Sequence, residues 1–197
     1  MTSHSKRKKS MSKEKKSLEE QAYDILNKAC LGWREVPASL SGRFHGGESM
    51  EQHIRTAVSI VNHLCDCYGV PEEDRDLCVA GAVLHDMGKF VISTPSKMMI
   101  KGWRYYPQTD YSRIEGLMKI HGPVGAAVLD DYKIDRQDEL KAIVASHMHR
   151  FSPDAPQPTT LYQHIVCMAD YISTIGNRED LFNWKPREKK EDKDAKE

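Results

Sequence analysis

The chain has 197 residues with 29 basic and 29 acidic side chains, so its formal net charge near pH 7 is zero. A neutral chain has no bulk electrostatic attraction to nucleic acid, and no run in it approaches the roughly 20 apolar residues of a membrane span. Its start lacks the apolar stretch of a signal peptide, and its five cysteines form no paired framework, which favours free thiols. We therefore expect one soluble, cytoplasmic domain.

Both ends of the chain are dominated by charge. Residues 1–16 carry seven lysines and arginines against one glutamate, and residues 185–197 are highly charged but nearly balanced. Such segments bury too little apolar surface to order themselves, so we expect two disordered tails around a helical domain at residues 17–184. The basic tail is expected to be solvated, with electrostatic binding of RNA or DNA as the alternative.

Two serine capping boxes predict the first two helices. Ser17, with a glutamate three residues later, predicts a helix that runs to about Leu31. Ser49, with a glutamine three residues later, predicts a long helix through about Tyr68. The apolar stripe of this second helix has 3-to-4 spacing, and His53 lies on the edge of that face.

A third helix is expected after Pro71, because proline and the acids that follow it suit a helix start. Its apolar, small-residue run ends in adjacent His85 and Asp86, followed by Gly88 and Lys89. A buried carboxylate costs several kcal/mol unless a cation or a partner compensates it. A divalent metal bound by both side chains is one interpretation, and a simple His–Asp hydrogen bond at a helix end is the other.

Residues 93–113 interrupt the helical periodicity and interleave aromatic with basic side chains, among them Lys101, Trp103 and Arg104. This composition suits the stacking of bases and the binding of phosphates, and a small β-hairpin fits the stretch around Lys101. The alternative is that these aromatics seal the edge of the domain or a dimer contact.

Two more helices are expected to bring one histidine each. The first runs from Glu115 to about Tyr132, and a proline requires a start or a kink near His121. Asp135 is expected to cap the second, whose 3-to-4 spacing puts His147 on the buried face.

The end of the predicted domain supplies two further candidates. His149 lies two residues after the previous histidine, so it should point elsewhere, toward substrate or to complete the ligand shell. A last core helix is expected at residues 161–175, with Asp170 beside its inward stripe. That stripe is predicted to consist of Ile165, Met168, Ala169 and Ile172.

The order of these residues resembles the HD superfamily of metal-dependent phosphohydrolases, over about residues 44–177. The stretch from His85 to Lys89 matches the HDxGK stretch of HD-GYP phosphodiesterases, which are two-metal members. The resemblance implies an all-α bundle of about six to eight helices in one domain, with one carboxylate bridging two ions. The implied metal ligands are His53, His85, Asp86, His121, His147 and Asp170, with Asp86 as the bridge.

Two segments are similar to the HD domain of 3′→5′ exoribonucleases. Residues 46–53 resemble the GG-x-x-E-H segment around the first ligand, with two extra residues between Gly47 and His53. Residues 111–121 are similar to the segment before the next histidine. This similarity and the aromatic-basic insertion predict hydrolysis of a phosphoester in nucleic acid, trimmed from a 3′ end.

The resemblance also assigns a cofactor and roles. Imidazole and carboxylate ligands suit one or two Mn²⁺, Fe²⁺ or Co²⁺ ions, with Zn²⁺ as a further candidate, better than Ca²⁺. Metal-activated water would attack phosphorus, and the expected partner is a nucleotide or single-stranded nucleic acid. The alternatives are hydrolysis of a small cyclic nucleotide or dinucleotide, and a metal-containing adaptor that binds nucleotide or RNA without cleaving it. The predicted catalytic residues are Asp86 and Lys89, and the predicted substrate contacts are Lys89, His149, Lys101, Trp103 and Arg104. A structural salt bridge is the alternative role for Lys89.

Overall fold

The computed structural model describes residues 15–30, 32–39, 48–93, 119–152 and 154–176. Within these ranges the chain is all-α and contains no strand, so the predicted fold class is confirmed. The predicted hairpin, Lys101, Trp103 and Arg104 lie outside the described residues, as do residues 1–14 and 185–197 of the predicted tails.

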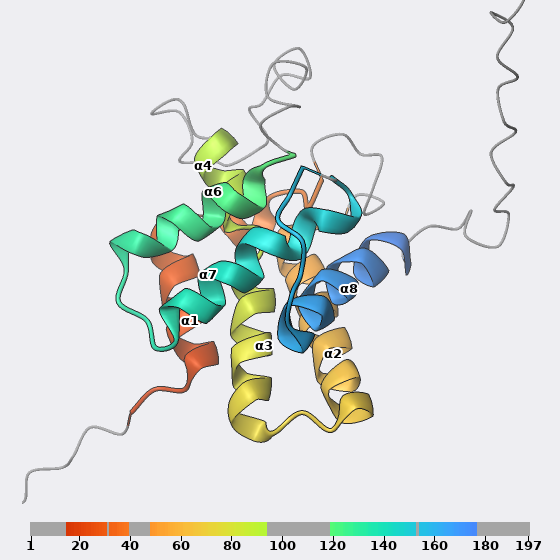
Figure 1. Cartoon of the computed structure of the whole chain (residues 1–197). Helices are drawn as coiled ribbons and strands as arrows, with labels where there is room; N and C mark the ends of the chain where they lie inside the picture. Colours follow the sequence, from red (N-terminus) through yellow and green to blue (C-terminus); the bar gives the residue numbers. More distant parts are fainter. Residues whose placement is uncertain (1–14, 31, 40–47, 94–118, 153, 177–197) are drawn as a thin grey trace, which may run out of the picture.

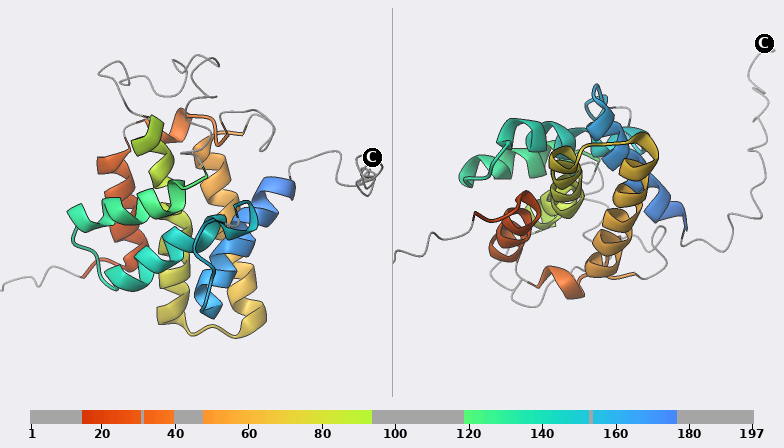
Figure 2. Two further views of the ribbon diagram at one scale, coloured as in Figure 1. Left: turned by 45° about the horizontal axis from the view of Figure 1, so that its top comes forward. Right: turned by 90° about the horizontal axis from the view of Figure 1, so that it is seen from below.

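The helices surround a central one. α3 packs against α1, α2, α7 and α8, while α4 packs against α6 at one end of α3 (Figure 1). The view from below shows α1 and α2 on either side of α3 (Figure 2). The α-helices are α1 (Leu18–Ala29), α2 (Met50–Tyr68), α3 (Glu72–Leu84), α4 (Met87–Ser93), α6 (His121–Val128), α7 (Gln137–Ser146) and α8 (Leu161–Gly176), and the 3₁₀ turns are η1 (Trp33–Glu35), η4 (Leu129–Asp131) and η5 (His147–Arg150).

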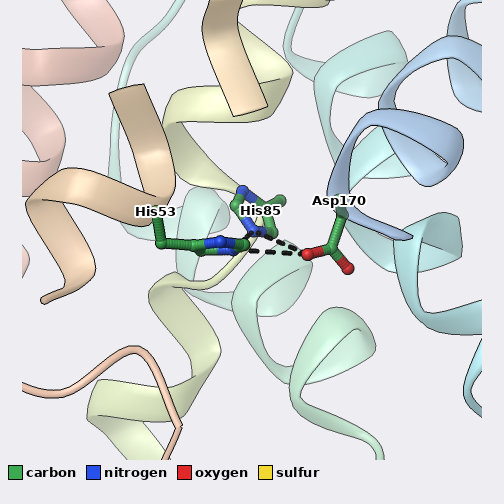
Figure 3. Close-up of side chains that lie close together, drawn as sticks. All are labelled: His53, His85 and Asp170. Carbon is green, nitrogen blue, oxygen red and sulfur yellow. Dashed lines mark hydrogen bonds and ion pairs between the residues drawn. The ribbon is translucent and has the colours of Figure 1, made fainter. Parts of the chain in front are cut away.

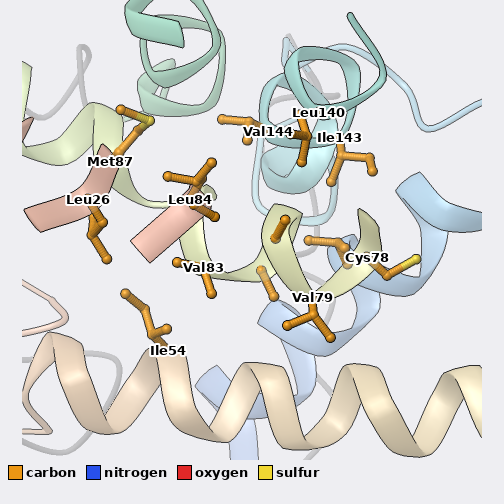
Figure 4. Close-up of a cluster of buried hydrophobic side chains, with 14 of the residues drawn as sticks. Leu26, Ile54, Cys78, Val79, Val83, Leu84, Met87, Leu140, Ile143 and Val144 are labelled. Carbon is orange, nitrogen blue, oxygen red and sulfur yellow. The ribbon is translucent and has the colours of Figure 1, made fainter. Parts of the chain in front are cut away.

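The small residues of α3 explain why this helix occupies the centre. Ala80 and Ala82 are completely buried, and a Cβ added at Gly81 would lie 2.6 Å from Cγ2 of Ile143. Larger side chains would hold the neighbouring helices apart. Figure 4 shows the resulting core, where side chains of α1, α2 and α7 meet those of α3. The carboxyl end of α3, and the turn that follows it, are thereby carried into the protein interior.

Both capping boxes are confirmed. The Ser17 hydroxyl accepts the Glu20 N–H at 3.1 Å, and the Glu20 carboxylate accepts the Ser17 N–H at 2.9 Å. Ser49 and Gln52 form the same reciprocal pair. α1 ends at Ala29, slightly before the predicted end, while α2 ends at Tyr68 as predicted.

The predicted start of α7 is wrong. Asp135 does not cap this helix: its N-cap is Arg136, in the left-handed region at φ 52°. The Asp135 carboxylate instead accepts a hydrogen bond from Gln21 of α1 at 2.9 Å and pairs with Lys15 at 3.0 Å. The Arg136 guanidinium donates to Asp74 of α3 at 2.7 Å. Contacts between helices therefore replace the local cap.

The start or kink predicted near His121 is confirmed as a start: α6 begins at His121, after a turn, and gives way to η4, which ends at Asp131. One other helix prediction needs correction, because the inward face of α8 is rotated: Met168 and Ile172 are only half-buried whereas Ser173 is buried. None of the described helices is long and apolar enough to cross a bilayer.

Asp76 of α3 holds the first turn of α1. Its two carboxylate oxygens accept the N–H groups of Leu18 at 2.7 Å and Glu19 at 2.9 Å. These N–H groups have no partner inside their own helix. Asp76→Asn is expected to lower the free energy of unfolding by about 1–3 kcal/mol, because the amide offers one acceptor oxygen and no charge.

Urea unfolding followed by circular dichroism measures this loss. Asp131→Asn is the matched control, since Asp131 is exposed at the end of η4, and its change should stay within about 0.5 kcal/mol. If Asp76→Asn were as stable as the control, Asp76 would not stabilise the start of α1.

Candidate metal centre

Six buried histidines and aspartates meet beside the carboxyl end of α3. They come from five segments of the chain: the first turn of α2, the turn between α3 and α4, the start of α6, the start of η5, and α8. None is more than 5% exposed. The six residues are His53, His85, Asp86, His121, His147 and Asp170, which is the whole set of predicted ligands.

One half of this cluster contains two imidazoles and two carboxylates. The Nε2 atoms of His53 and His85 are 2.9 Å apart. Both face Oδ1 of Asp170, at 3.3 and 3.6 Å (Figure 3). Both also lie 3.4 Å from Oδ2 of Asp86.

The other half contains two imidazoles around the second oxygen of the same aspartate. Oδ1 of Asp86 lies 2.9 Å from Nε2 of His121 and 3.7 Å from Nε2 of His147. These two Nε2 atoms are 3.0 Å apart. Asp86 is therefore shared, with one carboxylate oxygen directed to each half.

Backbone carbonyls determine which imidazole nitrogen carries the proton in two of the histidines. The Nδ1–H of His85 donates to the Ala82 carbonyl at 2.6 Å, and that of His147 donates to the Val144 carbonyl at 2.7 Å. Each carbonyl lies at the end of a helix, where carbonyls have no partner within the helix. In their neutral forms both rings therefore direct an Nε2 lone pair into the cluster.

The carboxylates of the cluster stay ionised although they are buried. Burial by itself raises the pKa of Asp86, but the Lys89 ammonium and the nearby imidazoles outweigh it and hold this pKa well below its usual range. Burial likewise raises the pKa of Asp170, and His53 and His85 hold it well below the usual range. Two buried negative charges in one cluster require positive charge beside them.

The pKa values of two histidines, His85 and His121, shift in opposite directions, because the carboxylates outweigh burial at the first and burial outweighs them at the second. Burial lowers the pKa of His85, but Asp86 and Asp170 overcome that effect and raise it to about 10. Burial lowers the pKa of His121 to about 4, against the opposing effect of Asp86. Protonation therefore supplies positive charge at His85 but not at His121. Metal ions bound by the cluster would supply positive charge at both places.

The donor set fits divalent transition metals. Two ligand atoms about 2.1 Å from one ion lie about 3.0 Å apart when they meet it at a right angle, and the Nε2 pairs are 2.9 and 3.0 Å apart. Imidazole and carboxylate together suit Mn²⁺, Fe²⁺, Co²⁺ and Zn²⁺. Potential ligand atoms lie within 4.8 Å of one another in two groups. These groups are His53, His85 and Asp170, and His85, Asp86 and His147.

Comparison with known proteins agrees with this arrangement. The model of the HD domain family matches residues 50–175, a range that contains all six clustered residues. The chain belongs to the HD domain family. This HD domain is similar to a dihydroneopterin 2′,3′-cyclic phosphate phosphodiesterase of Methanocaldococcus jannaschii, with 32% identity over 140 residues. The match covers 69% of this chain and 50% of the relative, so the chain spans about half the length of that protein. No solved structure matches.

Two of the other predicted site residues, Lys89 and His149, are among the described residues. Lys89 lies beside the cluster and donates to Oδ2 of Asp86 at 2.6 Å and to the Ala38 carbonyl at 3.0 Å. Its predicted contact with a phosphate stays a prediction, since this ammonium binds Asp86 in the structure. Lys101, Trp103 and Arg104 lie outside the described residues.

His149 is not brought into the cluster. Its Nδ1–H donates to the Ala155 carbonyl at 3.2 Å. It lines a pocket of about 390 Å³ together with Arg150, His164 and Cys167. His149 is thus directed to Ala155 and this pocket, and its contact with substrate stays a prediction.

Two residues beside the cluster were not predicted to take part in the site. Ser173 of α8 lies 3.3 Å from Nδ1 of His53. It follows Asp170 by three residues, a spacing that puts both on one helix face and that would have identified it. Gly88 is pressed against the backbone of His121. Gly88 is the glycine of the HDxGK stretch, so the sequence marks its position. Its contact with His121 could not be predicted, because the two residues are far apart in the chain.

Proposed function

We propose that this HD domain is a metal-dependent phosphodiesterase with a two-ion centre. The observation that carries the proposal is the position of Asp86. One of its carboxylate oxygens faces His53 and His85, and the other faces His121 and His147. A carboxylate that lies between two groups of imidazoles is suited to bridge two cations.

Each residue of the cluster has a definite task in this proposal. His53, His85 and Asp170 would hold one ion, and His121 and His147 the other, with Asp86 common to both. Two bound ions would supply an activated water and stabilise charge on the phosphoryl oxygens. Lys89 would keep Oδ2 of Asp86 in place. Mn²⁺, Fe²⁺ and Co²⁺ would be the preferred ions, because they accept mixed imidazole and carboxylate ligands.

The substrate we propose is a 2′,3′-cyclic phosphodiester on a nucleoside or a related small molecule. The support is the relative, whose name identifies it as a phosphodiesterase for a compound of this kind. A second candidate is the removal of nucleotides from the 3′ end of RNA. Residues 46–53 and 111–121 favour it through their similarity to exoribonucleases. In both reactions water attacks the phosphorus of a phosphodiester on a ribose: the exonuclease breaks the bond from phosphorus to the 3′ oxygen, and opening of the cyclic ester breaks the bond to the 2′ or the 3′ oxygen.

Hydrolysis assays with defined substrates test this function. The metal-stripped protein is supplied with Mn²⁺ and then given adenosine 2′,3′-cyclic phosphate, adenosine 3′,5′-cyclic phosphate, or a 5′-labelled single-stranded RNA. Opening of the 2′,3′-cyclic ester alone is the expected result. A ladder of RNA fragments that shortens from the 3′ end would instead support the exonuclease. Metal binding without hydrolysis of any substrate would contradict an enzymatic role and favour the adaptor.

A pair of histidines on one helix provides the control. His53 is buried in the cluster, whereas His63 is exposed on the same helix, α2. His53→Gln is expected to reduce hydrolysis by about 100-fold or more, since loss of one ligand weakens the metal centre. His63→Gln should retain the activity of the unmodified chain. Equal activity of the two variants would exclude the cluster as the active site.

A further inference from the structure

Ser173 lies between two residues of the metal centre. Its hydroxyl donates to the Asp170 carbonyl at 2.8 Å. A carbonyl can only accept, and serine has a single hydroxyl proton, so this bond uses it. Toward Nδ1 of His53, at 3.3 Å, the same oxygen therefore presents a lone pair. Ser173 is 1% exposed, so water does not readily replace its hydroxyl.

The consequence for His53 follows from this geometry. Its Nδ1 must carry the proton in order to donate to Ser173, which leaves a lone pair on Nε2. That Nε2 is the atom that faces His85, Asp86 and Asp170. His85 and His147 reach the same protonation pattern through carbonyls three residues earlier in their own helices or turns. For His53 the acceptor comes from α8, the helix that carries Asp170.

We infer that Ser173 is a positioning residue, which holds His53 in the tautomer and ring orientation needed to bind a divalent cation. It acts through His53 and does not touch substrate. It also links α2 to α8, so the two helices deliver His53 and Asp170 in a fixed relation. This inference rests on the proposed metal centre, but not on the reaction or the substrate.

Three variants separate this role from ordinary packing. Ser173→Ala removes the acceptor, and Ser173→Thr keeps it. Thr174→Val is the matched control: the Thr174 hydroxyl donates to the same Asp170 carbonyl, also at 2.8 Å, and its side chain is equally buried, at 2% exposed. Of these two hydroxyls, that of Ser173 lies within hydrogen-bond distance of His53, whereas that of Thr174 is directed to the Asp170 carbonyl.

The first measurement is Mn²⁺ affinity of the full chain by calorimetry. Loss of an outer hydrogen bond to a metal-binding histidine weakens affinity by about 10- to 100-fold, and this is expected for Ser173→Ala. Ser173→Thr and Thr174→Val should stay within about threefold of the unmodified chain. Unchanged affinity in Ser173→Ala, or an equal loss in Thr174→Val, would overturn the inference.

The second measurement needs no metal and no catalysis. Long-range ¹H–¹⁵N spectra of the metal-free protein report which nitrogen of each imidazole is protonated. His53 is expected to carry its proton on Nδ1, and to lose this preference in Ser173→Ala. A proton on Nε2 of His53 in the unmodified chain would overturn the inference even if Ser173→Ala failed to fold. Failure of the proposed phosphodiesterase activity would leave both measurements intact.

Discussion

Asp86→Asn is expected to release metal from both halves of the centre and to reduce hydrolysis by about three orders of magnitude. The amide keeps the shape of the side chain but has one neutral oxygen in place of two charged ones. Residue 86 can then give an oxygen ligand to only one half of the cluster, whereas Asp86 gives one to each half in the native protein. The half with His53 and His85 keeps the Asp170 carboxylate, but the half with His121 and His147 has no other carboxylate among the clustered residues. Metal ions contribute several kcal/mol to the stabilisation of transition-state charge, which corresponds to about a thousandfold in rate.

Two readouts are needed for this variant. Metal content after dialysis, by plasma mass spectrometry, tests the centre, and phosphodiester hydrolysis tests the reaction. Asp131→Asn changes an exposed aspartate and should leave both unaltered. If Asp86→Asn retained two ions per chain, Asp86 would not be the bridge. A further outcome is that Asp86→Asn loses metal and the unmodified chain also fails to hydrolyse every substrate. That result would support the metal centre and contradict the proposed enzymatic activity.

Gly88→Ala is expected to lower the free energy of unfolding by about 2–3 kcal/mol and to weaken metal binding. Alanine normally stabilises a helix relative to glycine by about 1 kcal/mol, so the expected sign is reversed here. A Cβ at Gly88 would lie 1.9 Å from the His121 carbonyl oxygen and 2.6 Å from the Gly125 nitrogen. Backbone cannot move aside as a flexible side chain can, so α6 must shift and carry His121 with it.

A graded comparison is available on the same interface. A Cβ at Gly125 would meet its nearest atoms, the Gly88 nitrogen and Cγ of Met87, at 3.0 and 3.1 Å. Gly125→Ala should therefore cost less, about 1 kcal/mol. Urea unfolding gives the stabilities and calorimetry gives the Mn²⁺ affinities. Gly88→Ala with native stability and native affinity would show that the contact between α4 and α6 does not position His121.

The predictions that held depend on interactions between residues close together in the chain. The cap at Ser17 is a pair of hydrogen bonds across three residues, so its partners are visible in the sequence. The burial of His53 and His147 follows from helical spacing on an apolar face. Asp135 is a residue type that often caps helices, but its carboxylate accepts a hydrogen bond from Gln21, more than a hundred residues away.

The amino-acid sequence by itself determined the family, the all-α class, and the identity of the six residues that converge. The order and spacing of these residues along the chain carry that information, because the helix or turn that contains each residue determines where its side chain points. Only the tertiary structure decided how Asp86 divides its two oxygens, that Lys89 binds Asp86 and the Ala38 carbonyl, and that Ser173 meets His53. These contacts join segments up to 120 residues apart, and their distances depend on how closely the helices pack.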